Sequence, residues 1–134
     1  MNSYNVDFET NKLKLNLKAY SEEFDYFDDK TCFNLFGIEC DKGWYGLINT
    51  IIEKIIDYNS SHIQKIEITQ IKEKYGGLRF YITFGTDEIY DLIDECEDES
   101  YNICEICGSK ENVFQTDGWI KTICKKCYEN EIRS

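Results

Sequence analysis

Residues 66–84 read IEITQIKEKYGGLRFYITF, and this stretch decides the fold of the larger part of the chain. Apolar and polar residues alternate strictly from Leu78 onward, whereas the alternation that opens the stretch slips by one residue at Ile71. A period of two is typical of strands with one buried face, and the slip predicts a β-bulge at Ile71. Gly76 and Gly77 provide the turn between the two runs. We therefore predict a β-hairpin that packs one face on the core.

An amphipathic helix is predicted directly before this hairpin. It starts at residues 41–43 and ends at residues 59–61. Apolar residues recur at intervals of three and four over three turns, at Trp44, Leu47, Ile48, Ile51, Ile52, Ile55 and Ile56. This spacing places them along one helical face. Because Trp44 begins that face, we expect its ring to be buried against Phe80 or Ile82.

A second helix is predicted after the hairpin, with Thr86 as its N-cap and acidic residues in its first turn. Its inner stripe consists of Ile89, Leu92, Ile93 and Cys96. Its outer face carries only acidic charges, on Asp87, Glu88, Asp91, Asp94, Glu95, Glu97, Asp98 and Glu99. This face either keeps the protein soluble or presents carboxylates to a basic partner. Under the second hypothesis the partner-binding residues are Asp91, Asp94, Glu95 and Asp98.

The N-terminal segment predicts a further hairpin. Val6 and Phe8 alternate with polar residues, as do Leu13, Leu15 and Leu17, and residues 11–12 can turn between the two runs. No structure is assigned to the acidic and aromatic residues 21–30. The predicted fold is thus an α+β domain over residues 1–102, in which an antiparallel β-hairpin sheet is packed by two helices. A small module follows over residues 103–134.

Four cysteines in that module predict a metal site. Cys104 and Cys107 form one CxxC pair and Cys124 and Cys127 form another, with sixteen residues between the pairs. Two CxxC pairs at such a separation are typical of four-thiolate zinc sites. A closed set of four ligands leaves no open coordination position, so we predict one structural Zn²⁺ ion. The alternatives are reduced cysteines packed as small apolar residues and a redox role for either pair.

The residues between the two cysteine pairs predict the shape of the module. Residues 112–115 and 119–123 are β-like, and Asp117-Gly118 between them is a strong hairpin-turn signal. Residues 124–132 can form a short helix with the second ligand pair in its first turn. A knuckle, a hairpin and a ligand-bearing helix in that order predict a treble-clef-like module, with a ribbon-like zinc module as the near alternative.

The net charge of the chain is −11, and it lies on the larger part. Residues 1–102 hold 21 acids and 10 bases, whereas the 5 acids and 5 bases that follow cancel. Such a charge disfavours a phosphate-neutralising surface, so we expect a protein partner, with a basic partner as one hypothesis, and no nucleic acid. No signal peptide or membrane span is visible in the sequence, so a cytoplasmic location with reduced cysteines is expected.

Residues 72–81 form the one locally basic stretch, with Lys72, Lys74 and Arg79 among aromatic side chains. This combination can serve a nucleic acid or another anionic partner, which makes a nucleic-acid-binding zinc finger the alternative function. The other interpretation is that the lysines solvate the turn and that Arg79 pairs with the acidic helix.

The remaining reactive residues fall singly. Cys96 lies on an apolar stripe and is interpreted as a core residue, whereas Cys32 and Cys40 are interpreted as core or surface thiols. His62 is the only histidine and is expected at the surface. No serine elbow, phosphate loop or paired-carboxylate signature accompanies it, so a non-enzymatic protein is expected.

Three motifs occur in this order along the chain: Gly43-Trp44 with Leu47-Ile48, the run IKEKYGGLRFY at residues 71–81, and a C-terminal pattern of Cys-x-x-Cys-Gly, Gly118-Trp119, Thr122 and Cys-x-x-Cys. With these motifs the chain resembles a group of small uncharacterised bacterial and phage proteins. The resemblance implies association with mobile elements and no established activity. We therefore expect a non-enzymatic, zinc-stabilised interaction protein, with modulation or inhibition of a host defence protein as one hypothesis.

Overall fold

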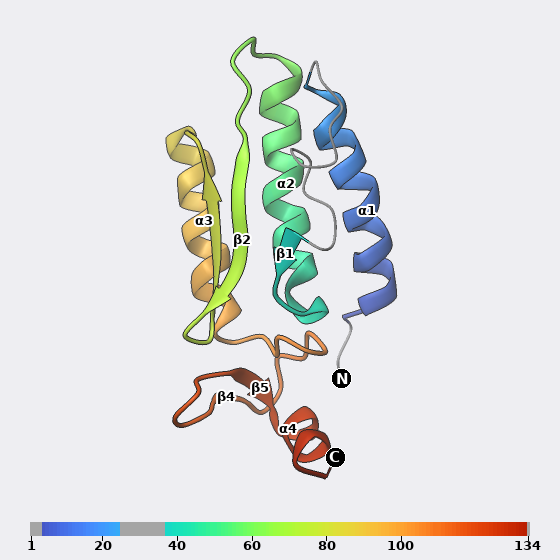
Figure 1. The fold of residues 1–134 in the computed structure, drawn as a ribbon, viewed down its shortest axis with the longest axis vertical. Helices are drawn as coiled ribbons and strands as arrows, with labels where there is room; N and C mark the ends of the chain where they lie inside the picture. Colours follow the sequence, from blue (N-terminus) through green and yellow to red (C-terminus); the bar gives the residue numbers. More distant parts are fainter. Residues whose placement is uncertain (1–3, 25–36, 134) are drawn as a thin grey trace.

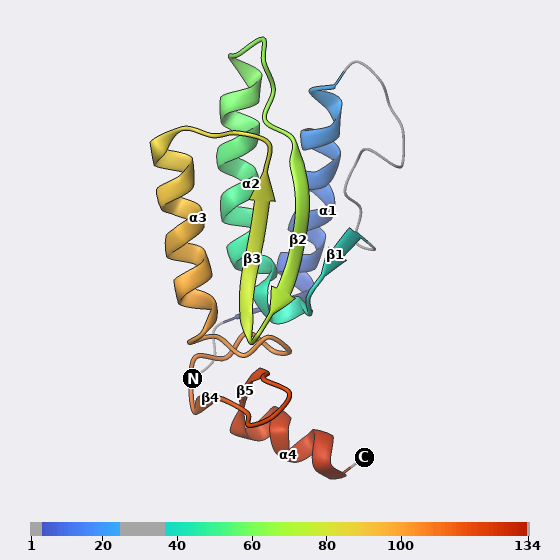
Figure 2. The same ribbon diagram turned by 60° about the vertical axis from the view of Figure 1, so that its left-hand side comes forward.

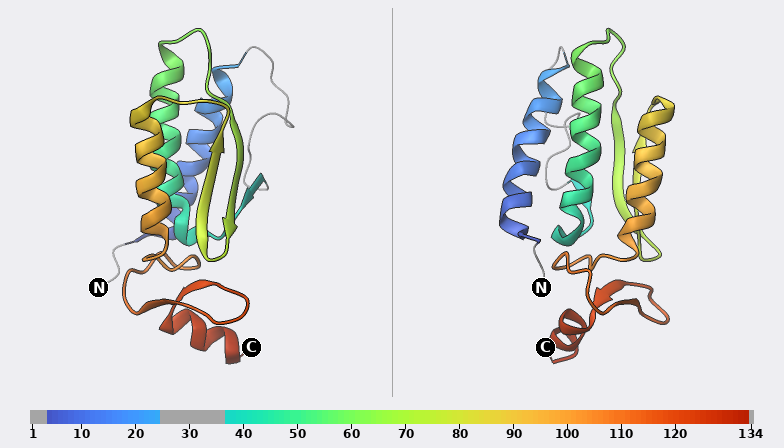
Figure 3. Two further views of the ribbon diagram at one scale, coloured as in Figure 1. Left: turned by 90° about the vertical axis from the view of Figure 1, so that its left-hand side faces the viewer. Right: turned by 180° about the vertical axis from the view of Figure 1, so that it is seen from behind.

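A computed structural model describes residues 4–24 and 37–133 of the chain and has an α+β fold (Figure 1). These residues form four α-helices and two small sheets. Helices α1 (Val6–Glu22), α2 (Tyr45–Ser60) and α3 (Asp87–Ser100) lie side by side on one side of the larger sheet, and the C-terminal module lies at one end of this body (Figure 3). No helix within the described ranges is long and apolar enough to cross a membrane.

Helix α1 occupies the segment for which the alternating leucines predicted a hairpin, so that prediction is wrong. Asn5 caps the helix, because its Oδ1 accepts the N–H of Phe8 at 2.9 Å. Leu13, Leu17 and Tyr20 are buried, whereas Leu15 is 69% exposed. Spacings of four and three place the buried residues on one helical face, which packs against α2. Burial of that face outweighs the short alternation of Leu13, Leu15 and Leu17.

Helix α2 confirms the amphipathic helix predicted before the hairpin. A 3₁₀ turn, η2 (Lys42–Trp44), precedes it, and its predicted inner residues Ile48, Ile51, Ile52 and Ile55 are completely buried. The side that faces α1 carries a buried polar residue, Asn49, whose amide donates to the backbone and side-chain oxygens of Glu9 at 3.0 Å each. Buried amides of this kind fix how two helices pack because each lost hydrogen bond is costly.

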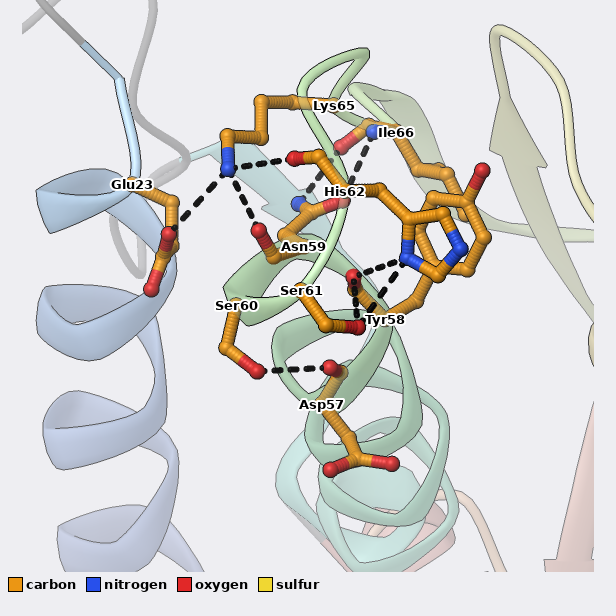
Figure 4. Close-up of polar contacts among 9 residues, drawn as sticks. All are labelled: Glu23, Asp57, Tyr58, Asn59, Ser60, Ser61, His62, Lys65 and Ile66. Atoms are coloured by element: carbon orange, nitrogen blue, oxygen red, sulfur yellow. Dashed lines mark hydrogen bonds and ion pairs between the residues drawn. The ribbon is translucent and has the colours of Figure 1, made fainter.

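Hydrogen bonds join the C-terminal end of α2 to the loop that follows it (Figure 4). The Asn59 amide donates to the Ile66 carbonyl at 3.1 Å, and the Ile66 N–H donates to Asn59 Oδ1 at 2.8 Å. Lys65 Nζ donates to the carbonyls of Asn59 and His62, where a cation complements the helix dipole. The His62 ring is exposed and stacks on Tyr58 with centroids 3.7 Å apart, which confirms its predicted surface position.

The larger sheet contains β1 (Ile38–Glu39), β2 (Ile68–Lys74) and β3 (Gly77–Ile82) in that order (Figure 2). Strands β2 and β3 form the predicted antiparallel hairpin, and their register shifts between Ile68 and Gln70. The predicted β-bulge is therefore present, but it lies on the N-terminal side of Ile71. Strand β1 pairs with β2 in parallel, so the sheet is mixed, whereas the prediction was an antiparallel sheet.

Helix α3 covers β3 and protects its free edge. The predicted N-cap is confirmed, because Thr86 Oγ1 accepts a backbone N–H of the first turn at 3.2 Å. At the other end of the helix, the Leu78 N–H donates to Ser100 Oγ and the Phe80 N–H donates to Glu97 Oε2, both at 2.9 Å. Unpaired N–H groups on an edge strand otherwise invite pairing with another strand. Glu97 therefore stabilises the sheet and does not belong to the free acidic surface.

The C-terminal module contains β4 (Val113–Gln115), β5 (Thr122–Cys124) and α4 (Lys125–Arg133), which confirms the predicted order of hairpin and helix. The turn differs from the prediction, because β5 starts at Thr122 and residues 116–121 form a loop. Thr116 closes this loop: its N–H donates to the Lys121 carbonyl at 3.0 Å, and its Oγ1 accepts the Lys121 N–H at 2.9 Å. Asp117-Gly118 therefore forms the tip of a loop and not a two-residue hairpin turn.

Candidate metal centre

The four cysteines of the two CxxC pairs converge on one point. Cys104 and Cys107 lie in the segment after α3, Cys124 ends β5, and Cys127 lies in the first turn of α4. Their four Sγ atoms all lie within 4.8 Å of one another, and those of Cys107 and Cys124 are 3.8 Å apart. Four soft sulfur donors at such distances can hold a metal ion.

Backbone hydrogen bonds shape the two ligand loops. The Gly108 N–H donates to the Cys104 carbonyl at 2.9 Å, and the Cys104 N–H donates to the Ser109 carbonyl at 2.8 Å, which folds the first pair into a knuckle. Gly108 has a φ of 80°, a conformation that residues with a Cβ rarely adopt. In the second pair, the Cys127 N–H points at Cys124 Sγ at 3.4 Å. An N–H directed at sulfur stabilises a thiolate there.

The pKa values of three of the four cysteines are shifted, and not all in the same direction. Burial raises the pKa of Cys107, and burial together with hydrogen bonding to Cys124 raises the pKa of Cys127. Burial acts in the same direction on Cys124, but the Cys127 N–H and the neighbouring sulfur atoms lower its pKa below the ordinary value. Thus ionisation is favoured at Cys124 and disfavoured at Cys107 and Cys127. A bound cation would supply the charge that lets all four ionise.

Glu105 joins the first ligand loop to the body. The Gly43 N–H donates to the Glu105 carbonyl at 2.6 Å, and the Asp41 N–H donates to Glu105 Oε2 at 3.0 Å. The Glu105 side chain is buried, which raises the pKa of its carboxyl to about 7 even though the Asp41 N–H acts in the opposite direction. A Cβ on Gly43 would lie 2.1 Å from the Cys104 carbonyl oxygen. Only glycine allows this approach of η2 to the ligand loop.

Trp44 connects the core of the body to the same loop. Its ring is completely buried in the apolar cluster that also contains Phe80, which confirms the expected burial. Its Nε1 donates to the Ile103 carbonyl at 2.9 Å, directly before the first candidate ligand. A buried indole N–H requires such a partner. The position of Cys104 is therefore fixed by a core residue of the body.

Tyr4 and Thr122 brace the module from two further directions. The Tyr4 ring packs against Gly108 so closely that a Cβ on Gly108 would lie 2.2 Å from Tyr4 Cδ1. The Tyr4 hydroxyl donates to the Lys42 carbonyl at 2.7 Å. Thr122 Oγ1 donates to the Gly76 carbonyl in a buried position. These contacts, like that of Glu105, join segments far apart in the sequence, so neither periodicity nor spacing signalled them.

The predicted partner-binding acids lie together on the exposed face of α3. Asp91, Asp94, Glu95 and Asp98 are all exposed, and their side chains form no hydrogen bond or ion pair within the described part of the chain. Glu88 differs, because its carboxylate lies 2.6 Å from Lys54 Nζ of α2.

The predicted basic residues share the sheet face that points away from the helices. Lys72 lies opposite Arg79 in the register of β2 and β3, and Lys74 follows two residues later. The expected ion pair between Arg79 and the acidic helix is not formed. The guanidinium instead donates to the Tyr101 hydroxyl at 3.0 Å and to the Leu78 carbonyl at 2.9 Å.

The other cysteines do not join the metal cluster among the described residues. Cys96 is buried in the core as predicted, and Cys40 is partly buried against that core, where burial raises the pKa of its thiol. Cys32 lies outside the described residues. Comparison of the chain with models of protein families, with curated proteins and with solved structures finds no match.

Proposed function

We propose that the chain is a non-enzymatic interaction protein whose C-terminal module is held by one structural zinc ion. The convergence of the four cysteine sulfurs within 4.8 Å supports this proposal. In a tetrahedral site with zinc–sulfur bonds of about 2.3 Å, the sulfurs lie about 3.8 Å apart, and the Cys107–Cys124 separation is 3.8 Å. Four protein ligands fill such a site, so the ion would have no open position for a substrate.

The order of elements supports a treble-clef-like module over a ribbon-like one. The first ligand pair lies in a knuckle, a hairpin follows, and the second pair lies where β5 passes into α4. A ribbon would place the second pair in a second knuckle. A ligand on the first turn of a helix is instead the arrangement that the sequence predicted.

Elemental analysis of the purified chain tests the metal. We expect one zinc ion per chain and its loss in Cys107→Ser and Cys124→Ser, whereas Cys96→Ala, a core variant outside the cluster, keeps its zinc. Four titratable thiols and no zinc in the native protein would contradict the proposal, and a bound iron ion would correct the identity of the metal.

The partner that fits this chain best is a basic protein. Four thiolates and one Zn²⁺ together carry −2, which takes the chain from −11 to about −13. A field of this sign opposes a polyanion and accelerates encounter with a cationic surface. The exposed, unpaired carboxylates of Asp91, Asp94, Glu95 and Asp98 provide the contact surface.

Charge reversal tests this surface against a matched control. The chain is used to capture partners from an extract of the cells that produce it, at low and at high salt. Capture should weaken with salt and be lost when Asp91, Asp94, Glu95 and Asp98 are changed to lysine. The control changes Glu22, Glu39, Asp57 and Glu67, which are exposed acids outside α3, and alters the net charge equally. Equal loss in both variants would show that only net charge matters and would contradict a specific surface on α3.

A further inference from the structure

A groove separates the β2–β3 turn of the body from the β4–β5 loop of the module. Figure 2 shows the turn directly beside this loop. The groove has a volume of about 420 Å³, and its main lining residues are Lys72, Glu73, Lys74, Tyr75, Trp119 and Ile120. It is distinct from the metal site and from the acidic face of α3.

The two walls of the groove are held in place although their tips are exposed. Thr122 Oγ1 donates to the Gly76 carbonyl, which ties β5 to the β2–β3 turn. Thr116 Oγ1 donates to the Trp119 carbonyl at 2.8 Å and also accepts the Lys121 N–H, so the loop is ordered from within. Trp119 is nevertheless 88% exposed. Its ring is presented to solvent by a pre-organised loop, which lowers the entropic cost of binding.

The backbone conformation of Tyr75 is an independent indication that this surface has a binding role. The turn residues Tyr75 and Gly76 have φ values of 53° and 84°. Two successive positive φ values are typical of a hairpin turn that favours Asn-Gly, and a tyrosine there is strained. The ring is 70% exposed, so its burial does not offset that strain. Residues with strained backbone conformations are concentrated at active sites and ligand-binding sites.

We propose that this groove binds a segment of a partner protein that carries a carboxylate beside an aromatic or proline ring. Tyr75 and Trp119 offer two ring faces, against which planar or cyclic side chains stack. Lys74 Nζ lies 5.7 Å from the Tyr75 ring centroid, and Lys72 Nζ lies 6.0 Å from the Tyr81 ring centroid. Each ammonium group is therefore close to an aromatic ring. These cations would pair with the carboxylate.

The other charges near the groove are already engaged. Glu73 Oε2 accepts the Gly76 N–H at 2.7 Å, which directs this carboxylate into the turn. Lys121 Nζ forms an ion pair with Glu131 at 2.7 Å. Of the cations that line the groove in the described part of the chain, Lys72 and Lys74 therefore remain for a ligand.

A peptide fits these charges better than a nucleic acid. Two lysines can neutralise only about two phosphates, and non-specific nucleic-acid affinity falls with that number and with salt. The net charge of −11 repels a polyanion before any contact forms. A segment with one or two carboxylates experiences less repulsion and still uses both aromatic rings.

This site goes beyond the proposed function, because it takes a ligand of the opposite charge on a different surface. The test is a selection from a random peptide library displayed on phage, with the full-length, metal-loaded chain as the target. Enriched peptides should share Asp or Glu next to Phe, Tyr, Trp or Pro. Binding of one synthetic member should change the fluorescence of Trp119, whereas Trp44 is buried and should respond little.

Substitutions of groove residues test whether the selected peptide binds in the groove. Trp119→Ala should weaken the selected peptide by about tenfold or more, and the pair Lys72→Glu and Lys74→Glu should shift a repeated selection toward Lys and Arg. The matched controls are Ile63→Ala, a fully exposed apolar residue elsewhere, and the pair Lys14→Glu and Lys18→Glu. Circular dichroism and zinc content establish that each variant is folded, and Trp119→Phe replaces Trp119→Ala if the latter is not.

Several results would overturn the site. The selection could yield no enriched peptide, peptides without an acidic residue, or binding that Trp119→Ala leaves unchanged. Oligothymidylate that binds more tightly than the selected peptide, and loses affinity in the same variants, would assign the groove to single-stranded nucleic acid. Zinc content and capture through α3 should not change in Trp119→Ala, so failure of this site is distinguishable from failure of the proposed function.

Discussion

The body and the C-terminal module of this chain differ in what holds them together. The body buries one continuous apolar cluster that extends from Leu13 in α1 to Ile103. The cluster buried in the module consists of Cys104, Ile123 and Cys124, and two of these three are candidate metal ligands. A segment of about thirty residues cannot bury enough apolar surface to fold alone. The four cysteines can hold a metal ion, which together with contact with the body would take the place of a core.

The junction between the two regions shows how the body contributes. Core residue Trp44 and the glycine before it both hydrogen-bond to the first ligand loop, and the Gly76 carbonyl accepts a hydrogen bond from β5. The body thus offers a surface that is already shaped for the module. The difference predicts that the body tolerates loss of the module, whereas the module requires both the metal and the body.

Metal removal should have the largest effect. Structural zinc supplies on the order of 10 kcal/mol or more of folding free energy, so chelation or Cys124→Ser should unfold residues 104–133 and leave α1, α2 and α3 intact. Hydrogen exchange read by residue distinguishes the regions, and Cys96→Ala serves as the control. Unfolding of the whole chain as one unit would show that the two regions are not separable.

Trp44→Ala should destabilise the body next most strongly, by about 3–5 kcal/mol, because a fully buried indole leaves a cavity. Urea denaturation measures the loss. Trp44→Phe keeps most of the apolar volume but leaves the Ile103 carbonyl without its donor, which costs about 1–3 kcal/mol. An unchanged free energy of unfolding in Trp44→Ala would contradict its place at the centre of the core.

Thr122→Val should weaken the junction itself. The substitution keeps the shape of the side chain and removes the buried hydrogen bond to the Gly76 carbonyl, at a cost of about 1–3 kcal/mol. Its expected signature is faster zinc release to a chelator with little change in the denaturation of the body. Thr122→Ser keeps the hydroxyl and should retain most of the coupling. If both variants release zinc at the wild-type rate, the hydrogen bond does not link the regions.

Tyr75→Asn should give the smallest change, and in the opposite direction. Asparagine tolerates positive φ better than tyrosine, so the free energy of unfolding should rise by about 1 kcal/mol. Tyr81→Asn, at an exposed strand position, is the matched control and should destabilise the hairpin slightly. A loss of stability in Tyr75→Asn would show that the Tyr75 ring contributes to folding, which would remove one argument for the groove.

Elements with a long, unambiguous period could be predicted from the sequence. The isoleucine stripe of α2, the alternation in β3 and the acidic first turn of α3 each admit one interpretation, and paired CxxC motifs have few uses other than metal binding. Helix α1 could not be assigned in this way, because Leu13, Leu15 and Leu17 also fit a strand. Only contact with α2 decides that Leu15 points outward and Tyr20 inward.

Features that depend on distant partners could not be predicted. Strand β1 has two residues, and its pairing with Ile71 and Lys72 follows from the tertiary fold alone. Glu105 looks like an ordinary charged residue between two ligands, yet it accepts two N–H groups from the segment before α2. The loop 116–121 differs from the predicted turn because the Thr116 side chain closes it, which a dipeptide signal cannot indicate.

The junction also sets the order in which a newly made chain can mature. Trp44, Gly76 and Tyr4, which receive the module, all leave the ribosome before Cys124 and Cys127. Domains generally fold from the N-terminus during synthesis, so the body can be complete while its docking surface still lacks a partner. Metal uptake by the four cysteines would therefore follow the folding of the body, and a nascent chain interrupted before Cys127 would display a folded body whose docking surface is uncovered.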